Sequence, residues 1–378
     1  MPKPVRAGRL RPEELQRRVR GKPRRQEAQP MVSVTRALNI RHLSSGGLIT
    51  NYYCTSRCGH CLYCCSPQWD RRYIDAATTR QNLETIRRLG CQAVHVGGGE
   101  PFLNPEGLLR VVTIAREAGV RIEYVETNSS WYRDQPSAAT LLRELKDRGL
   151  GALLISISPF HNEHIPFQQV KGVIEACRVT GLAAFPWVSG FYKELDAFDP
   201  RTPHRLEEYE ARFGADYLER IPARYWIHLG GRAVQTFAGV LPTFESAAIL
   251  NRDRRGCREL QDVSHFHLDL FGHYIPGLCA GLAIRGDDLG SPLNPDKYPL
   301  LAQLHASGIN GLWAVAREHG FQAKGAYLSK CHLCQDIRRY LVMDRELTFT
   351  ELAPRGFYEN LSAAPHARSG FNDAPDTK

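Results

Sequence analysis

Three cysteines follow one another closely in the segment Cys54-Thr-Ser-Arg-Cys58-Gly-His-Cys61. Thiolates at this spacing can reach three irons of one cubane iron–sulfur cluster from a single loop. Four cysteines usually close such a cluster, so the fourth iron would be free to bind a small chelating molecule. Zinc is the alternative, because it takes four nitrogen or sulfur ligands in a tetrahedron, and the set could be completed by His60, Cys64 or Cys65.

The cysteine loop is expected to follow a strand over residues 47–53, the first of a series in which strands and helices alternate. Further strands are predicted over 91–96, 121–127, 152–158, 182–188 and 225–234, and helices over 79–89, 105–118, 138–148 and 170–180. This alternation implies right-handed crossovers and a parallel sheet. Six units are too few for an eight-fold barrel. We therefore expect an α/β fold, a partial (β/α)6 TIM-like barrel with its mouth at the carboxyl ends of the strands.

A second motif, Gly98-Gly99-Glu100-Pro101, stands at the end of the second predicted strand. Together the two motifs resemble the radical S-adenosylmethionine (SAM) superfamily over residues 46–240. The resemblance implies a [4Fe–4S] cluster on Cys54, Cys58 and Cys61, with SAM chelating the fourth iron. It also implies reductive cleavage of SAM to a 5′-deoxyadenosyl radical, which takes hydrogen from an unidentified peptide, nucleoside, sugar or other small molecule. An electron donor such as flavodoxin or ferredoxin would be needed.

The same resemblance indicates which residues contact SAM. Glycines without side chains let the backbone approach a ligand closely, which suits Gly98 and Gly99, with Glu100 and Pro101 after them. Polar residues that end the later strands are the other cofactor-binding candidates, although they could instead cap the turns that follow; they are Thr127, Asn128, Ser156, Ser158 and Ser189.

A loop over the predicted mouth contains His161-Asn-Glu-His164. Histidine donates, accepts or moves protons near neutral pH, so His161 is the catalytic candidate, with an ordinary surface histidine as the alternative. The stretch Gly230-Gly231-Arg232-Ala233 resembles one found in family members that have a cluster-bearing C-terminal extension. Its arginine could hold a carboxylate, cap a helix or form a salt bridge.

A second group of cysteines lies toward the C-terminus, namely Cys257, Cys279 and Cys331-His-Leu-Cys334. A hairpin with its turn at Phe271-Gly272 is predicted to lead to Cys279. This pattern resembles the SPASM and Twitch auxiliary-cluster modules. It implies a second, fully ligated [4Fe–4S] cluster, and zinc in the same four positions is the alternative.

Four cysteines lie outside both sets. Cys64 and Cys65 follow the first set directly, and we weigh incidental packing against contact with a substrate or cluster. Cys91 and Cys177 fall in a predicted strand and a predicted helix, where each is expected to be a small core residue.

Composition bounds the class of protein. The chain has 378 residues, of which 43% are hydrophobic, and no apolar run approaches the roughly 20 residues that span a bilayer. Eleven cysteines, an odd number bunched at short spacing, do not look like a secreted disulfide framework. We therefore expect a cytoplasmic enzyme.

Four regions are expected along the chain: a basic N-terminal arm (1–45), the partial barrel (46–241), the auxiliary module (242–348) and a polar tail (349–378). The net charge of +9 owes much to the arm. Such an arm could contact an acidic partner, so the alternative to an enzyme is a zinc-stabilised nucleic-acid-binding protein. No aromatic residue lies between the charges of the arm, so a base-stacking surface is not supported.

Overall fold

Strands and helices alternate along the first half of the chain, in a computed structural model that describes residues 37–362. In chain order these elements are β1 (Gly46–Ile49), α1 (Ala76–Arg88), β2 (Ala93–Gly97), α2 (Pro105–Glu117), β3 (Arg121–Thr127), α3 (Gln135–Asp147), β4 (Ala152–Ile155), α4 (Pro159–Asn162), α5 (Phe167–Thr180) and β5 (Ala183–Pro186). The four predicted helices and the first five predicted strands are present, with ends shifted by a few residues.

Polar N-cap residues fix where the crossover helices begin. Asp75 accepts a hydrogen bond from the backbone N–H of Thr78 at the start of α1. Asn104 accepts one from Gly107 at the start of α2. Such caps contribute about 1 kcal/mol each. They set the point at which each loop from the preceding strand must end, and these loops form the site described below.

One sheet of eight strands has the order β5-β4-β3-β2-β1-β7-β8-β9. Strands β1 to β5 pair in parallel. Strand β7 (Phe266–Asp269) also pairs in parallel, with β1, although it lies far along the chain. Strands β8 (His273–Ile275) and β9 (Ile284–Arg285) extend that edge in antiparallel fashion. The mostly parallel sheet confirms the predicted α/β class and is consistent with a partial TIM-like barrel.

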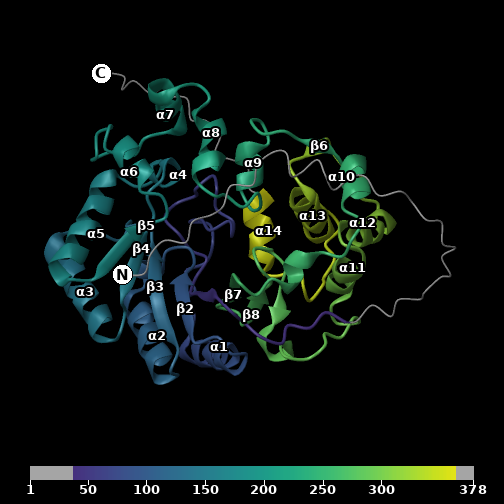
Figure 1. The fold of residues 1–378 in the computed structure, drawn as a ribbon, viewed down its shortest axis with the longest axis horizontal. Helices are drawn as coiled ribbons and strands as arrows, with labels where there is room; N and C mark the ends of the chain where they lie inside the picture. Colours follow the sequence, from purple (N-terminus) through teal and green to yellow (C-terminus); the bar gives the residue numbers. More distant parts are fainter. Residues whose placement is uncertain (1–36, 363–378) are drawn as a thin grey trace, which may run out of the picture. The chain divides into compact units, whose positions relative to one another are not determined.

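Helices α1, α2, α3 and α5 lie in chain order along the outside of the strands (Figure 1). They bury apolar residues such as Leu83, Val111 and Leu142, which belong to one continuous core with the strands. The crossover helices therefore hold the sheet from one side and leave the loops at the carboxyl ends of the strands to face one another.

The sixth predicted strand, over residues 225–234, is wrong. That segment is a loop after α8 (Tyr217–Arg224), followed by the short helix α9 (Ala233–Phe237). Its alternating apolar residues resemble a strand, but strand preference depends strongly on neighbouring contacts. Here Gly231, with a φ of +56°, lies against the carbonyl oxygen of Cys61. This contact draws the segment against the cysteine loop instead of into the sheet.

The second half of the described chain is mostly helical. Its further elements are α6 (Gly190–Leu195), α7 (Leu206–Phe213), β6 (Phe244–Glu245), α10 (Ser246–Arg252), α11 (Pro299–Ser307), α12 (Ile309–Glu318), β10 (Ala326–Tyr327), α13 (Lys330–Arg339) and α14 (Arg355–Ser362). Figure 1 shows α11, α12 and α13 grouped together, in green to yellow.

The predicted hairpin after Cys257 is present. Asp269 at the end of β7 accepts hydrogen bonds from the backbone N–H groups of Phe271 and His273, which closes the turn into β8. Because β7 pairs with β1, the segment predicted as a separate module shares the main sheet. The segment predicted as the tail begins with α14, which buries Phe357 and Tyr358.

No helix among the described residues is long and apolar enough to cross a membrane. Most of the predicted basic arm, residues 1–36, and the end of the predicted tail, residues 363–378, lie outside the described residues. The expectations for those segments therefore stay predictions.

Candidate functional site

The first cysteine set lies on the loop after β1 and lines one cavity of about 450 Å³. Cys54 Sγ accepts hydrogen bonds from the backbone N–H of Ser56 at 3.4 Å and from Asn128 Nδ2 at 3.3 Å. The Cys61 N–H donates to the Cys58 carbonyl at 3.1 Å, which winds the loop into a tight turn. The structure thus brings together the three cysteines that the spacing singled out.

The electrostatic surroundings of the three thiols differ. Burial raises the pKa of Cys54 to about 12 and also raises the pKa of Cys58. A hydrogen bond with the Cys65 side chain lowers the pKa of Cys61 to about 5, and the charge of Arg232 acts in the same direction. Thiolate is the form that binds metals, so the cysteine loop already favours one thiolate before any ligand binds.

Two glycines at the end of β2 allow close contact with the cysteine loop. Gly98 has a φ of +145°, a conformation that favours glycine, and a Cβ on Gly99 would collide with the Tyr53 carbonyl. The Gly99 N–H donates to the Asn51 carbonyl at 2.7 Å. The glycine motif therefore packs against the residues that lead into Cys54, and both glycines line the cavity.

Glu100 lies behind the cavity rather than on its wall. Its carboxylate accepts hydrogen bonds from the backbone N–H of Phe102 at 3.1 Å and of Asn128 at 2.6 Å, and from the Thr127 hydroxyl at 3.1 Å. Its side chain is fully buried, and burial raises its pKa to about 7. Glu100 therefore joins the end of β2 to the end of β3, while the next residue, Pro101, lines the cavity.

The ends of β3 and β4 place three more candidates on the cavity wall, namely Thr127, Asn128 and Ser156. The other two serines are elsewhere. Ser158 is buried, and its Oγ lies 2.7 Å from His161 Nδ1. Ser189 precedes α6 and is absent from the cavity wall, which Trp187 and Val188 reach instead.

His161 lines the cavity, as the sequence predicts for the loop after β4. Its ring meets the His60 ring edge-on, with centroids 4.9 Å apart. Burial lowers the pKa of His161 to about 3, and His164 acts in the same direction. The imidazole is therefore neutral near pH 7 and can both donate and accept a hydrogen bond.

Arg232 has a role that the sequence left open. Its Nε donates to the Cys58 carbonyl at 3.0 Å and its Nη2 to the Cys65 carbonyl at 2.6 Å, while its backbone N–H donates to the Cys61 carbonyl at 3.1 Å. The side chain is buried and lines the cavity. Arg232 thus holds the backbone of the cysteine loop. Within the described part of the chain, its hydrogen bonds go to carbonyl groups of that loop rather than to a carboxylate.

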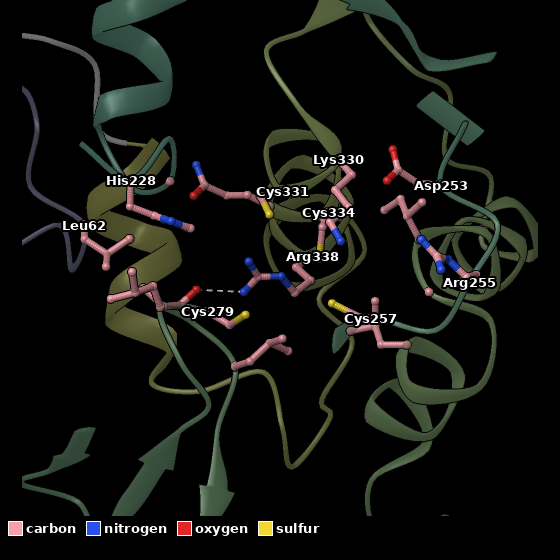
Figure 2. Close-up of a pocket in the computed structure, with 18 residues that line it drawn as sticks. Leu62, His228, Asp253, Arg255, Cys257, Cys279, Lys330, Cys331, Cys334 and Arg338 are labelled. Atoms are coloured by element: carbon pink, nitrogen blue, oxygen red, sulfur yellow. Dashed lines mark hydrogen bonds between the residues drawn. The ribbon is translucent and has the colours of Figure 1, made fainter. Parts of the chain in front are cut away.

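The four later cysteines also meet. Cys331 and Cys334 stand on α13, Cys279 follows β8, and Cys257 lies in the loop after α10. All four line one small cavity of about 40 Å³ and point toward the space around the Arg338 guanidinium (Figure 2). Cys257 Sγ also donates to Glu259 Oε2 at 3.1 Å. The structure therefore brings the second predicted set together from three segments of the chain.

A hydrogen-bonded pair connects the two cysteine sites. The side chain of Gln335, next to Cys334, accepts from the Gly231 N–H at 2.6 Å and donates to the Gly231 carbonyl at 3.1 Å. Gly231 directly precedes Arg232, which holds the first cysteine loop. The helix that bears the second set thus fixes the backbone beside the first.

Sequence reasoning left Cys64 and Cys65 open and missed Tyr63. Cys65 lines the cavity and hydrogen-bonds Cys61, whereas Cys64 is wholly buried with a φ of +53°. Cys91 and Cys177 are buried, as predicted. Tyr63 also lines the cavity, and its place two residues after Cys61 was the available signal.

Comparison with known proteins finds a family match over the part of the chain that contains the first site. The model of the Radical SAM superfamily matches residues 48–185, which contain the cysteine loop and the glycine motif. An uncharacterized protein of Methanocaldococcus jannaschii is 28% identical over 111 residues, which make up 29% of this chain and 34% of that protein. The chain therefore spans about a third of the length of that curated relative.

Several solved structures are also similar. BtrN in complex with AdoMet and 2-DOIA is 13% identical, with a TM-score of 0.35, over 64% of this chain and 75% of that one. The enzyme anSMEcpe with bound AdoMet is 15% identical, with a TM-score of 0.35, over 62% and 74%. Methylornithine synthase is 16% identical, with a TM-score of 0.30, over 39% and 44%.

Proposed function

We propose that this chain is a radical SAM enzyme, which binds a [4Fe–4S] cluster on Cys54, Cys58 and Cys61 and cleaves SAM reductively, because the model of that superfamily matches residues 48–185. The observation that carries the proposal is the loop itself. Cys54, Cys58 and Cys61 line a cavity of about 450 Å³, together with Cys65 and with Gly98, Gly99 and Pro101 of the glycine motif. That arrangement leaves room for a chelating ligand beside the cysteines.

Buried polar atoms on the cavity wall fit this cluster and cofactor. Ser56 Oγ, His60 Nδ1 and Arg232 Nη1 are buried and lack hydrogen-bond partners within the described part of the chain. All three residues line the cavity. Buried polar groups normally have partners, and a buried guanidinium favours an anion. An anionic cluster with a polar ligand would satisfy these atoms.

When bound, the cluster supplies one electron that cleaves SAM to methionine and a 5′-deoxyadenosyl radical. Gly98, Gly99 and Pro101 offer backbone to the methionine part, and Thr127, Asn128 and Ser156 offer polar groups at the strand ends. Glu100 positions two of these groups through its hydrogen bonds. Ser158 acts through His161. Ser189 is the weakest cofactor candidate, because it does not reach the cavity.

His161 is the residue we propose to contact the substrate. It reaches the cavity beside His60, and its hydrogen bond to Ser158 fixes the ring orientation. A neutral imidazole can orient a hydroxyl, amide or amine of a substrate without adding charge. Exposed Trp187 and Trp226 also line the cavity, so an organic substrate would meet both aromatic and polar surface.

We assign the second cysteine set, by the same resemblance, to an auxiliary [4Fe–4S] cluster on Cys257, Cys279, Cys331 and Cys334. Buried Arg338 and the Lys330 side chain line the same cavity and suit an anionic cluster. Tetrahedral zinc would hold thiolate sulfurs about 4 Å apart. Among the described residues, the group with three metal-ligating atoms within 4.8 Å of one another consists of histidines. The four cysteines do not form such a group, so their spacing supports a cluster rather than zinc.

A reductant and a substrate follow from the superfamily. A flavodoxin or ferredoxin would supply the electron. An auxiliary cluster near the substrate could accept an electron after hydrogen abstraction, which favours net oxidation of a peptide or small molecule. The substrate itself is not specified by the residues of the cavity.

The proposal is tested with anaerobically purified and reconstituted protein. Wild type should contain about eight irons and eight sulfides per chain, because each cubane holds four of each. It should form 5′-deoxyadenosine when dithionite and SAM are added. The variant Cys54/Cys58/Cys61→Ala should retain about four irons and form no 5′-deoxyadenosine. Cys177→Ala, which alters a buried cysteine of α5 outside both sets, is the matched control and should behave as wild type.

Other outcomes would decide against parts of the proposal. About four irons in wild type, all lost in the triple variant, would refute the second cluster. A colourless preparation with zinc and no sulfide would refute the enzyme and favour the zinc-stabilised nucleic-acid-binding protein.

A further inference from the structure

Three histidines meet on the wall of the same cavity, apart from both cysteine sets. One ligating nitrogen from each of His95, His265 and His267 lies within 4.8 Å of the other two. His95 Nε2 and His267 Nε2 are 3.0 Å apart. His265 and His267 line the cavity, and His95 and His267 are buried. Such proximity of three imidazoles needs an explanation in the fold.

The register of the sheet brings the histidines together. Gly47 of β1 is the partner of His95 in β2 on one side and of His267 in β7 on the other. A Cβ on Gly47 would collide with the His95 ring. Because Gly47 has no side chain, the rings of His95 and His267 meet across β1. His265 lies two residues before His267, and it therefore lies on the same face of the sheet. The arrangement thus depends on a glycine placed between two histidines.

Neighbouring groups fix the rings as they do around bound metals. Tyr63 Oη lies 2.8 Å from His267 Nδ1, so the nitrogen that faces away from His95 has a partner. The His95 ring hydrogen-bonds the backbone of Gly46 and stacks on Tyr124, with centroids 5.2 Å apart. Metal-binding histidines usually have their second nitrogen held in this way.

The charge of the cluster also suits a cation. A neutral imidazole binds a metal ion through a ring nitrogen, and each of the three rings offers such a nitrogen close to the other two. The Glu126 carboxylate lies 4.0 Å from His95 Nε2 and lines the cavity. Three imidazoles with one nearby carboxylate form a donor set typical of zinc and iron.

We propose that His95, His265 and His267 bind one divalent first-row transition metal ion, with Glu126 as the fourth ligand. Zinc is the probe of choice, because it is redox-inert and is distinguished from cluster iron by elemental analysis. The site is on the cavity wall, and Tyr63 connects it to the first cysteine loop. Zinc binding does not require SAM cleavage, so this proposal and the proposed function can fail separately.

The test uses protein whose cysteine sites are loaded with iron and sulfide, so that free thiols do not bind zinc. The protein is equilibrated anaerobically with Zn²⁺ at low micromolar concentration, passed through a desalting column, and analysed for zinc, iron and sulfide. Wild type should retain about one zinc per chain. His265→Ala and His267→Ala should lose it. His42→Ala removes an exposed histidine and should retain it.

Two subtler variants keep the proposal falsifiable if His267→Ala fails to fold. Tyr63→Phe keeps the ring and removes the hydrogen bond to His267, so zinc affinity should fall about 10–100-fold. His265 is only partly buried, so His265→Ala should keep its full iron and sulfide content. No zinc on wild type, or equal zinc on wild type and His265→Ala, would overturn the proposal.

Discussion

The two cysteine sites of this protein are formed in different ways. Cys54, Cys58 and Cys61 share one loop after one strand, whereas Cys257, Cys279 and the α13 pair come from three segments. The first site opens onto a cavity of about 450 Å³ and the second encloses about 40 Å³. A short loop would supply three ligands of the proposed cluster and leave room for a substrate, while the set drawn from distant segments surrounds a smaller space.

Each site contains a buried arginine, and the two arginines bind different partners. Arg232 donates to carbonyls of the cysteine loop itself. Arg338 donates to the Ala280 carbonyl at 2.8 Å and to the Tyr358 hydroxyl at 3.2 Å. The first arginine therefore holds the backbone of one loop, while the second joins segments that are far apart in the chain.

The largest effects are expected when these two arginines are substituted. Arg232→Met should remove two charge-assisted hydrogen bonds, each worth about 1.5–3 kcal/mol. We expect iron to fall from about eight to about four per chain and 5′-deoxyadenosine formation to stop. Arg338→Met should also lose about four irons but retain SAM cleavage. If both variants lost the same activity, the two sites would not be independent in this way.

A smaller effect is expected where the glycine motif meets the loop. Gly99→Ala would place a Cβ against the Tyr53 carbonyl, and overpacking of this kind costs about 1–3 kcal/mol. SAM binding should weaken, as measured by equilibrium dialysis, while the second site keeps its iron. Gly151→Ala is the matched control, because a Cβ there meets nothing within 4 Å. Equal SAM affinity in the two variants would contradict the contact.

An effect on stability alone, and not on the binding of iron or SAM, is expected from pH and the buried carboxylates of the two halves. Burial raises the pKa of Glu100 to about 7 from an ordinary value of 4.5. As the pH rises, Glu100 loses its proton at a lower pH in the unfolded state than in the folded state. Its contribution to stability is therefore fully present below pH 4.5 and is lost as the pH rises through 7. From pH 5 to pH 8 the free energy of unfolding should fall by about 2.5 kcal/mol because of this carboxyl group.

Glu100→Gln should remove that part of the pH dependence, as measured by urea unfolding at both pH values. Glu351 is the counterpart in the C-terminal half, where it accepts from the Leu300 N–H at 2.7 Å and burial also raises its pKa. Glu351→Gln should reduce the pH dependence with the same sign and leave SAM binding unchanged. An unaltered pH profile in Glu100→Gln would show that this carboxyl is ionised throughout.

The sequence predicted what local spacing determines. The cysteine loop and the glycine motif are short, and each follows a strand that the hydrophobic pattern indicates. The predicted strand over 225–234 failed because its fate depends on Gly231 packing against Cys61, a contact far away in sequence. The role of Arg232 could not be predicted either, because its partners are also far away in sequence. They are backbone carbonyl groups, which residues of any type have.

The histidine cluster shows a further limit. His265 lies two residues before His267, where the predicted hairpin begins, but the meeting of these two histidines with His95 depends on β7 pairing with β1. The sequence predicted the hairpin and gave no sign of which strand it would join. A glycine in the strand between two histidines carries that information only after the register is known.

The contact between Gln335 and Gly231 has a consequence for the order of assembly. On the ribosome the first cysteine loop emerges long before α13, yet the backbone beside it is held by a side chain of α13. The backbone beside the loop can therefore take its final form only after α13 has been made. We expect iron and sulfide to enter the first cysteine site of a chain in which α13 is already present.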